Sequence, residues 1–112
     1  DTGGSSVSPA AFSSVTHGAN TVTAKIICTA ACTVDFYLIT EMMSDGYATF
    51  TLHGTDYSLY GASGESRSLI LAAGTYSFGI TLDTPDSGNR ASLYITGASN
   101  GISSPSYIEI NN

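Results

Sequence analysis

Apolar and polar residues alternate through most of the chain, and this alternation predicts β-strands. In the clearest segment, residues 74–83, one face carries Tyr76, Phe78, Ile80 and Leu82, and the other carries Thr75, Ser77, Gly79 and Thr81. A period of two residues is typical of a half-buried strand. The same period predicts strands over residues 21–28, 33–40, 47–53, 57–60, 90–96 and 106–110. The apolar run Leu69-Ile70-Leu71 predicts a further, buried strand over residues 67–72.

Turn-forming residues separate these segments. They include Ser44-Asp45-Gly46, the loop residues 61–64, the segment 83–89 and Asn100-Gly101. No segment has the sustained 3.6-residue period of a helix. About eight short strands with a turn signal in each gap predict an all-β fold, a single antiparallel β-sandwich of the immunoglobulin-like or jelly-roll-like type. We expect the sandwich over residues 20–112, preceded by an extended Gly/Ser-rich arm over residues 1–19.

The segment Leu71-Ala72-Ala73-Gly74-Thr75-Tyr76 has the pattern Leu-x-x-Gly-x-Tyr. It resembles the entry to a tyrosine corner in secreted Greek-key sandwiches, including immunoglobulin-like and prepeptidase-C-terminal-like modules. The resemblance covers residues 67–96. It implies that the Tyr76 hydroxyl bonds back to nearby backbone, and it concerns the fold and not the function.

The composition favours a location outside the cytoplasm. Only 11% of the residues are charged, and polarity comes instead from 17 Ser and 14 Thr. The net charge of −6 argues against nucleic acid and anionic membrane surfaces as partners. No apolar run has the length of a membrane span, so we expect no membrane insertion. The chain begins without Met, as a processed mature form would, and we expect an extracellular or cell-surface location.

Two cysteines, Cys28 and Cys32, are separated by three residues. A zinc site would need a second pair of ligands, and a redox motif would place the two cysteines closer together at a helix start. A local disulfide across a turn is the favoured interpretation, with free buried thiols as the alternative.

The sequence contains no catalytic or phosphate-binding motif, and we expect no enzymatic activity and no cofactor. One metal site is conceivable. Asp83, Asp86 and Asn89 fall within seven residues and could contribute oxygen ligands to Ca²⁺, which prefers six to eight. The alternative is that these residues form an ordinary turn.

Five tyrosines suggest a surface for glycans. The predicted strands direct Tyr37, Tyr47 and Tyr94 outward, and Tyr57 and Tyr60 lie near a loop. Sugars stack on exposed aromatic rings, which suggests a secreted binding module for a glycan or cell surface. Against this, tyrosine is a common strand residue, and the chain has no Trp.

The hypothesis that we favour is self-assembly. Isolated sandwiches guard their edge strands with lysines and other charges, and this chain has a single lysine, Lys25. The arm, with Val7, Phe12 and Val15 among small residues, could complete the sheet of a neighbouring copy. Head-to-tail pairing of this kind gives a filament or pilus-like polymer, and a virion coat or decoration protein is a further alternative. The arm could instead fold back as the first strand of its own sheet.

Overall fold

The fold was analysed in a computed structural model, which describes residues 11–41, 46–83, 88–99 and 106–111. These residues form nine β-strands and no helix, which confirms the predicted all-β class, although the alternation predicted about eight strands and did not include the first. The strands are β1 (Ser13–His17), β2 (Thr21–Cys28), β3 (Cys32–Glu41), β4 (Tyr47–Leu52), β5 (Thr55–Tyr60), β6 (Ser63–Leu71), β7 (Gly74–Leu82), β8 (Arg90–Ala98) and β9 (Tyr107–Asn111). The described ranges contain no helix that is long and apolar enough to cross a membrane.

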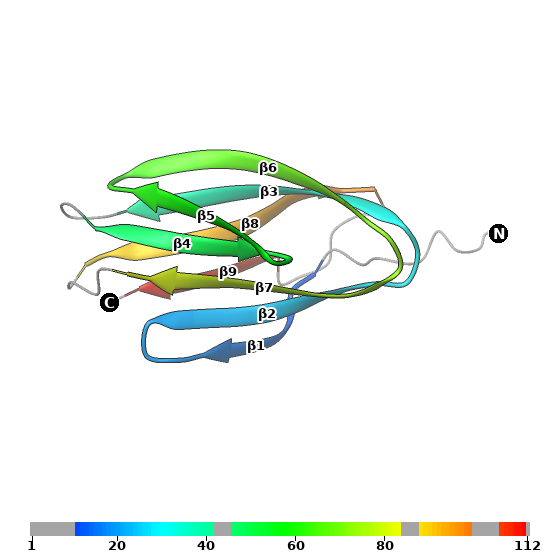
Figure 1. The fold of residues 1–112 in the computed structure, drawn as a ribbon, viewed down its shortest axis with the longest axis horizontal. Helices are drawn as coiled ribbons and strands as arrows, with labels where there is room; N and C mark the ends of the chain where they lie inside the picture. Colours follow the sequence, from blue (N-terminus) through cyan, green and yellow to red (C-terminus); the bar gives the residue numbers. More distant parts are fainter. Residues whose placement is uncertain (1–10, 42–45, 84–87, 100–105, 112) are drawn as a thin grey trace.

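The strands make two antiparallel sheets that pack as a sandwich (Figure 1). One sheet has the order β1-β2-β7-β4-β5 and the other has the order β6-β3-β8-β9. The neighbours β1-β2-β7 and β9-β8-β3 follow the order of the A-B-E and G-F-C strands of an immunoglobulin domain. The hairpin β4–β5 extends the first sheet before the chain returns to the second sheet as β6.

The predicted inward faces form one core between the sheets. Its fully buried side chains include Phe36, Phe50 and Phe78. The rings of Phe36 and Phe78 lie 5.2 Å apart between centroids and join the two layers. Continuous burial of every second residue stabilises the sandwich, since each large apolar side chain contributes about 1.5–3 kcal/mol when removed from water.

Two features of the chain path differ from expectation. Ser63 and Gly64, predicted as loop, begin the strand β6, and Ile70, predicted as buried, is 86% exposed. The physical reason is alternation along β6, which places Leu69 and Leu71 on the core side and Ile70 on the outer face, where it meets solvent. The hairpin between β4 and β5 was missed, and it turns at His53 and Gly54 with φ of 48° and 85°, as a two-residue type I′ turn requires.

The predicted tyrosine-corner hydrogen bond is present. The Tyr76 hydroxyl donates to the Ala72 carbonyl at 2.7 Å. The ring of Tyr76 packs against the core and meets the His53 ring edge-on, with centroids 4.5 Å apart. The bond therefore fixes the connection from β6 to β7 against the end of the β4–β5 hairpin.

Candidate functional site

The described part of the N-terminal arm folds onto its own domain. Residues 13–17 form β1, which pairs with β2, and Phe12 is 2% exposed. The Phe12 ring meets Phe78 edge-on at 6.0 Å. This is the arrangement in which the arm completes its own sheet, so the sandwich includes Phe12 and β1 and does not begin at residue 20. Val7 lies outside the described residues, and Val15 is 41% exposed.

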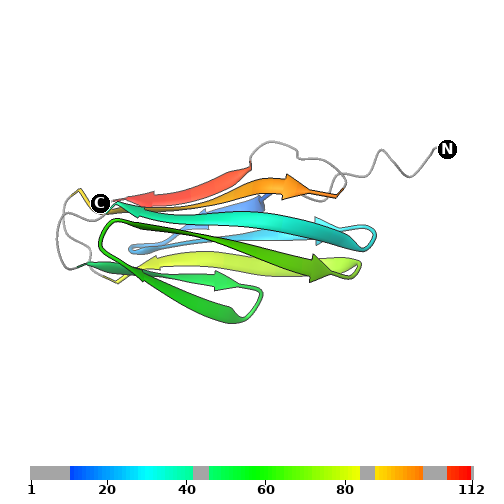
Figure 2. The ribbon, with the colours of Figure 1, turned by 90° about the horizontal axis from the view of Figure 1, so that it is seen from above.

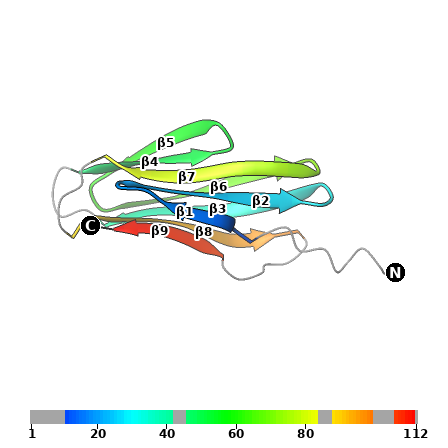
Figure 3. The ribbon, with the colours of Figure 1, turned by 90° about the horizontal axis from the view of Figure 1, so that it is seen from below.

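The strand β1 is a short and irregular edge. Its register with β2 shifts between Ser13 and Thr16, and Ser14 has a φ of 53°. On its other side, the His17 Nε2 atom lies 3.3 Å from the carbonyl oxygen of Glu109 on β9. Figure 3, seen from below, looks onto this side, where β1 and β9 lie next to each other. A bulge and a short length are features that protect an edge from further pairing.

The strand β6 is a different kind of edge. All nine of its residues pair with β3 in an unbroken register, and no described strand lies on its other side. Figure 2, seen from above, looks onto the side of the molecule where the edges β5 and β6 lie. The outward face of β6 carries no charge, since its exposed residues are Gly64, Ser66, Ser68 and Ile70. A long, regular and uncharged edge is the kind that accepts another strand.

The charged residues of β6 lie on its other face, toward β5. Arg67 forms a salt bridge with Glu65. Its guanidinium also lies over the Tyr57 ring, 4.7 Å from the centroid. Tyr57 is partly buried and packs against the core, and a role for Tyr57 in ligand binding stays a prediction.

The other predicted tyrosines lie on outer faces, in two groups. Tyr37 and Tyr94 pair across β3 and β8, and Tyr94 pairs with Tyr107 on β9. Tyr94 and Tyr107 stack at 5.2 Å. A methyl group on Gly64 would lie 2.1 Å from the Tyr37 hydroxyl, so Tyr37 lies over that glycine. Each of these rings therefore contacts a neighbouring residue and also remains exposed, Tyr107 to 48%. Tyr107 was missed by the sequence analysis, because only the register of β8 with β9 places it beside Tyr94.

The second tyrosine group lies on the other sheet. Tyr47 and Tyr60 stack at 5.0 Å, and Tyr60 is 66% exposed. Close to them, the Thr49 hydroxyl donates to the Asp83 carboxylate at 2.8 Å. Glycan binding by any of these tyrosines stays a prediction.

The two cysteines meet in the core. Cys28 and Cys32 are buried free thiols whose Sγ atoms lie 2.7 Å apart. Burial and the hydrogen bond to Cys32 raise the pKa of the Cys28 thiol to about 12. The two sulfur atoms are close to each other, but no bond joins them in this structure, so the disulfide stays a prediction.

The candidate calcium ligands are only partly described. Asp83 is exposed and bonded to Thr49, whereas Asn89 is buried at 1% exposure. Asp86 lies outside the described residues. The described ranges hold no cluster of three or more His, Cys, Asp or Glu side chains that could bind a metal. The calcium site stays a prediction.

Comparison with known proteins adds a weak likeness to solved structures. No family model matches the sequence, and no curated protein matches it. A solved structure, the N-terminal domain of PorA, is 15% identical. The match covers 93% of this chain and 86% of that chain, with a TM-score of 0.46. A likeness at this level carries no argument about what this chain does.

Proposed function

We propose that this chain is a building block of an extracellular assembly, in which an extended segment of one copy adds a strand to the sheet of the next. The chain would act by packing and backbone pairing, without catalysis. The observation that supports this function best is the edge β6. Its nine residues span about 30 Å at roughly 3.3 Å per residue. Such an edge presents unpaired backbone groups to a partner strand.

The partner of β6 in this proposal is the segment that precedes Phe12 in a second copy. Phe12 is in the core and β1 is in its own sheet. The proposal therefore assigns the pairing with another copy to residues upstream of Phe12, including Val7. Ile70, at 86% exposure, offers an apolar contact on the outer face of β6. Pairing of one end of a copy with a different surface of the next copy is heterologous, and it gives an open filament when it does not close into a ring.

The first experiment is a deletion of residues 1–10, followed by negative-stain electron microscopy and a thermal melt. We expect wild-type polymers to disappear while the melting temperature stays unchanged, because Phe12 and β1 remain in place. A longer deletion through residue 19 would also remove the core side chain of Phe12, and loss of polymers would then report unfolding. Polymers that persist after the short deletion, or a wild type that stays monomeric at high concentration, would contradict the proposal.

A second experiment tests the edge. Ser66 on β6 and Ser58 on β5 are both exposed serines on edge strands. We expect Ser66→Lys to prevent polymers and the matched control Ser58→Lys to leave them intact, because a lysine guards only the edge that carries it. If Ser66→Lys still forms filaments, β6 is not the pairing edge.

A further inference from the structure

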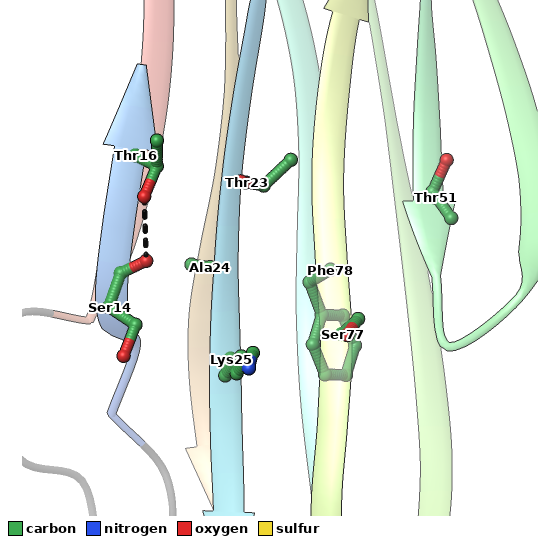
Figure 4. Close-up of a pocket in the computed structure, with 8 residues that line it drawn as sticks. All are labelled: Ser14, Thr16, Thr23, Ala24, Lys25, Thr51, Ser77 and Phe78. Carbon is green, nitrogen blue, oxygen red and sulfur yellow. Dashed lines mark hydrogen bonds between the residues drawn. The ribbon is translucent and has the colours of Figure 1, made fainter. Parts of the chain in front are cut away.

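A shallow hollow lies on the outer face of the sheet that contains β2 and β7. Its volume is about 430 Å³, within the usual range of ligand sites. Residues from β1, β2, β7 and β4 line it (Figure 4): Ser14, Thr16, Thr23, Ala24, Lys25, Thr51, Ser77 and Phe78. The hollow is therefore built from four strands, and β4 and β7 are far from β1 and β2 in the sequence.

The register of the strands explains why the face is hollowed. Thr23 and Thr51 both pair with Gly79, one from each side. Gly79 has no side chain, so the Thr23 side chain lies over it, with Cγ2 3.4 Å from where a methyl group on Gly79 would be. The shift of register between β1 and β2 opens the same face near Ser14 and Thr16. An added methyl group at Gly79 would lie 3.1 Å from the Val22 carbonyl oxygen, which makes the glycine important for the packing as well.

The chemistry of the lining is one-sided. Five of the lining side chains are hydroxyls, one is the ammonium of Lys25, and none is acidic. Lys25 is the chain's single lysine, and it forms no salt bridge with any residue that the structure describes. The Thr51 hydroxyl donates its hydrogen to the Asp56 carboxylate at 2.7 Å. Its oxygen can therefore act toward a ligand only as a hydrogen-bond acceptor. The hollow thus offers hydrogen-bond donors, acceptors and one positive charge.

We propose that this hollow binds a carboxylated saccharide, with Lys25 bonded to the carboxylate and the surrounding hydroxyls bonded to the hydroxyls of the sugar. A charge-assisted hydrogen bond between ammonium and carboxylate is stronger than one between neutral groups. Sugar hydroxyls both donate and accept, which matches a lining of serines and threonines. A single ammonium pairs with a single carboxylate, and the net charge of −6 disfavours a long polyanion. The ligand class is therefore a short saccharide that contains a hexuronate unit.

The open side of the hollow allows a longer chain to continue across the sheet. A second row of hydroxyls crosses the same face, because Thr21, Thr81 and Thr49 pair in register with one another and Thr49 pairs with Ser58. The site differs in place and chemistry from the tyrosine groups, which offer aromatic rings and no ammonium. It is also independent of the edge β6, which belongs to the other sheet.

The experiment is a calorimetric titration of the full chain with tri-galacturonate and, for comparison, with the neutral trisaccharide maltotriose. We expect binding of the acidic sugar that weakens as salt is raised, and at least about tenfold weaker binding by the Lys25→Met variant. Lys25→Arg, which keeps the charge, is expected to stay within about threefold of the wild type. Thr33→Val, a control that also removes one exposed hydroxyl but lies on the other sheet, is expected to bind as the wild type does.

Three results would overturn the proposal. One is equal binding of the neutral and acidic sugars, and another is an unchanged affinity in Lys25→Met. The third is no heat of binding for tri-galacturonate at millimolar concentration with the wild type. A melting curve for each variant confirms that it is folded, which is expected because Lys25 and Thr33 are both exposed. The result does not depend on whether the chain forms filaments.

Discussion

Replacement of Phe12 by Ala tests where the N-terminal arm belongs. Phe12 is 2% exposed and lies against Phe78. A buried aromatic side chain covers roughly 150–250 Å². At about 25 cal/mol per Å², its burial contributes on the order of 4–6 kcal/mol, an upper estimate because the unfolded chain is already partly compact. Phe→Ala substitutions in cores typically cost about 3–5 kcal/mol.

We expect Phe12→Ala to lower the free energy of unfolding by about 3 kcal/mol, the low end of that range. The reason is that Phe12 is attached to a five-residue edge strand, which can relax around the space left behind. The matched control is Val15→Ala on the same strand. Val15 is 41% exposed, and its truncation is expected to change the stability by less than about 0.5 kcal/mol.

Urea unfolding followed by circular dichroism measures both variants, at several protein concentrations. If Phe12 packs within its own copy, the midpoint of the wild type is independent of concentration. A midpoint that rises with concentration would place Phe12 in a neighbouring copy. Equal stability of Phe12→Ala and Val15→Ala would refute the placement of Phe12 in the core.

Three further predictions concern the corner, the thiols and the outer face of the second sheet. Tyr76→Phe removes only the hydroxyl bonded to Ala72, and it should cost about 1 kcal/mol in urea unfolding; an unchanged midpoint would show that the corner bond is not stabilising. In the reduced protein, the pKa of the Cys28 thiol is raised from 9.0 to about 12, so the folded state keeps this proton at pH values where the unfolded state loses it. The contribution of Cys28 to the free energy of unfolding is therefore complete below pH 9 and falls as the pH rises toward 12, by at most about 1.4 kcal/mol per pH unit. A Cys28→Ser variant whose unfolding free energy falls equally steeply over this range would contradict that origin. Gly64→Ala should displace Tyr37 from β6, which tyrosine fluorescence and a melt would detect; a spectrum and a melting temperature that match the wild type would mean that Tyr37 does not rest there.

Period-two alternation was enough to predict the fold class and most of the core. In β2 every second residue is apolar and buried, and in β3 and β7 most of the alternate residues are. This works because a strand directs alternate side chains to opposite faces, and one face of each sheet must exclude water. The local pattern at Gly74-Thr75-Tyr76 also predicted its hydrogen bond, since the bond spans four residues and is set by local geometry.

Edge strands were harder to predict from the sequence. The strand β1 has four exposed residues out of five, and its polar composition resembles that of a loop. In β6, a Gly/Ser-rich start and an exposed Ile70 obscured the alternation. An edge strand is defined by having one neighbour, and that is a property of the assembled sheet. Backbone pairing does not require any particular side chain, so the sequence carries little record of it.

The candidate sites, like the strands, depend partly on local sequence and partly on the assembled sheets. The sequence by itself determined that this is an all-β sandwich with a hydroxyl-rich, weakly charged surface, because those properties depend on composition and on the period of two residues. Only the tertiary structure decided that Phe12 fills its own core and that Tyr107 lies beside Tyr94. It also decided that Lys25 shares a hollow with Thr51, which is far from it in the sequence. The physical reason is that register between strands, set by the packing of the whole core, determines which distant residues become neighbours.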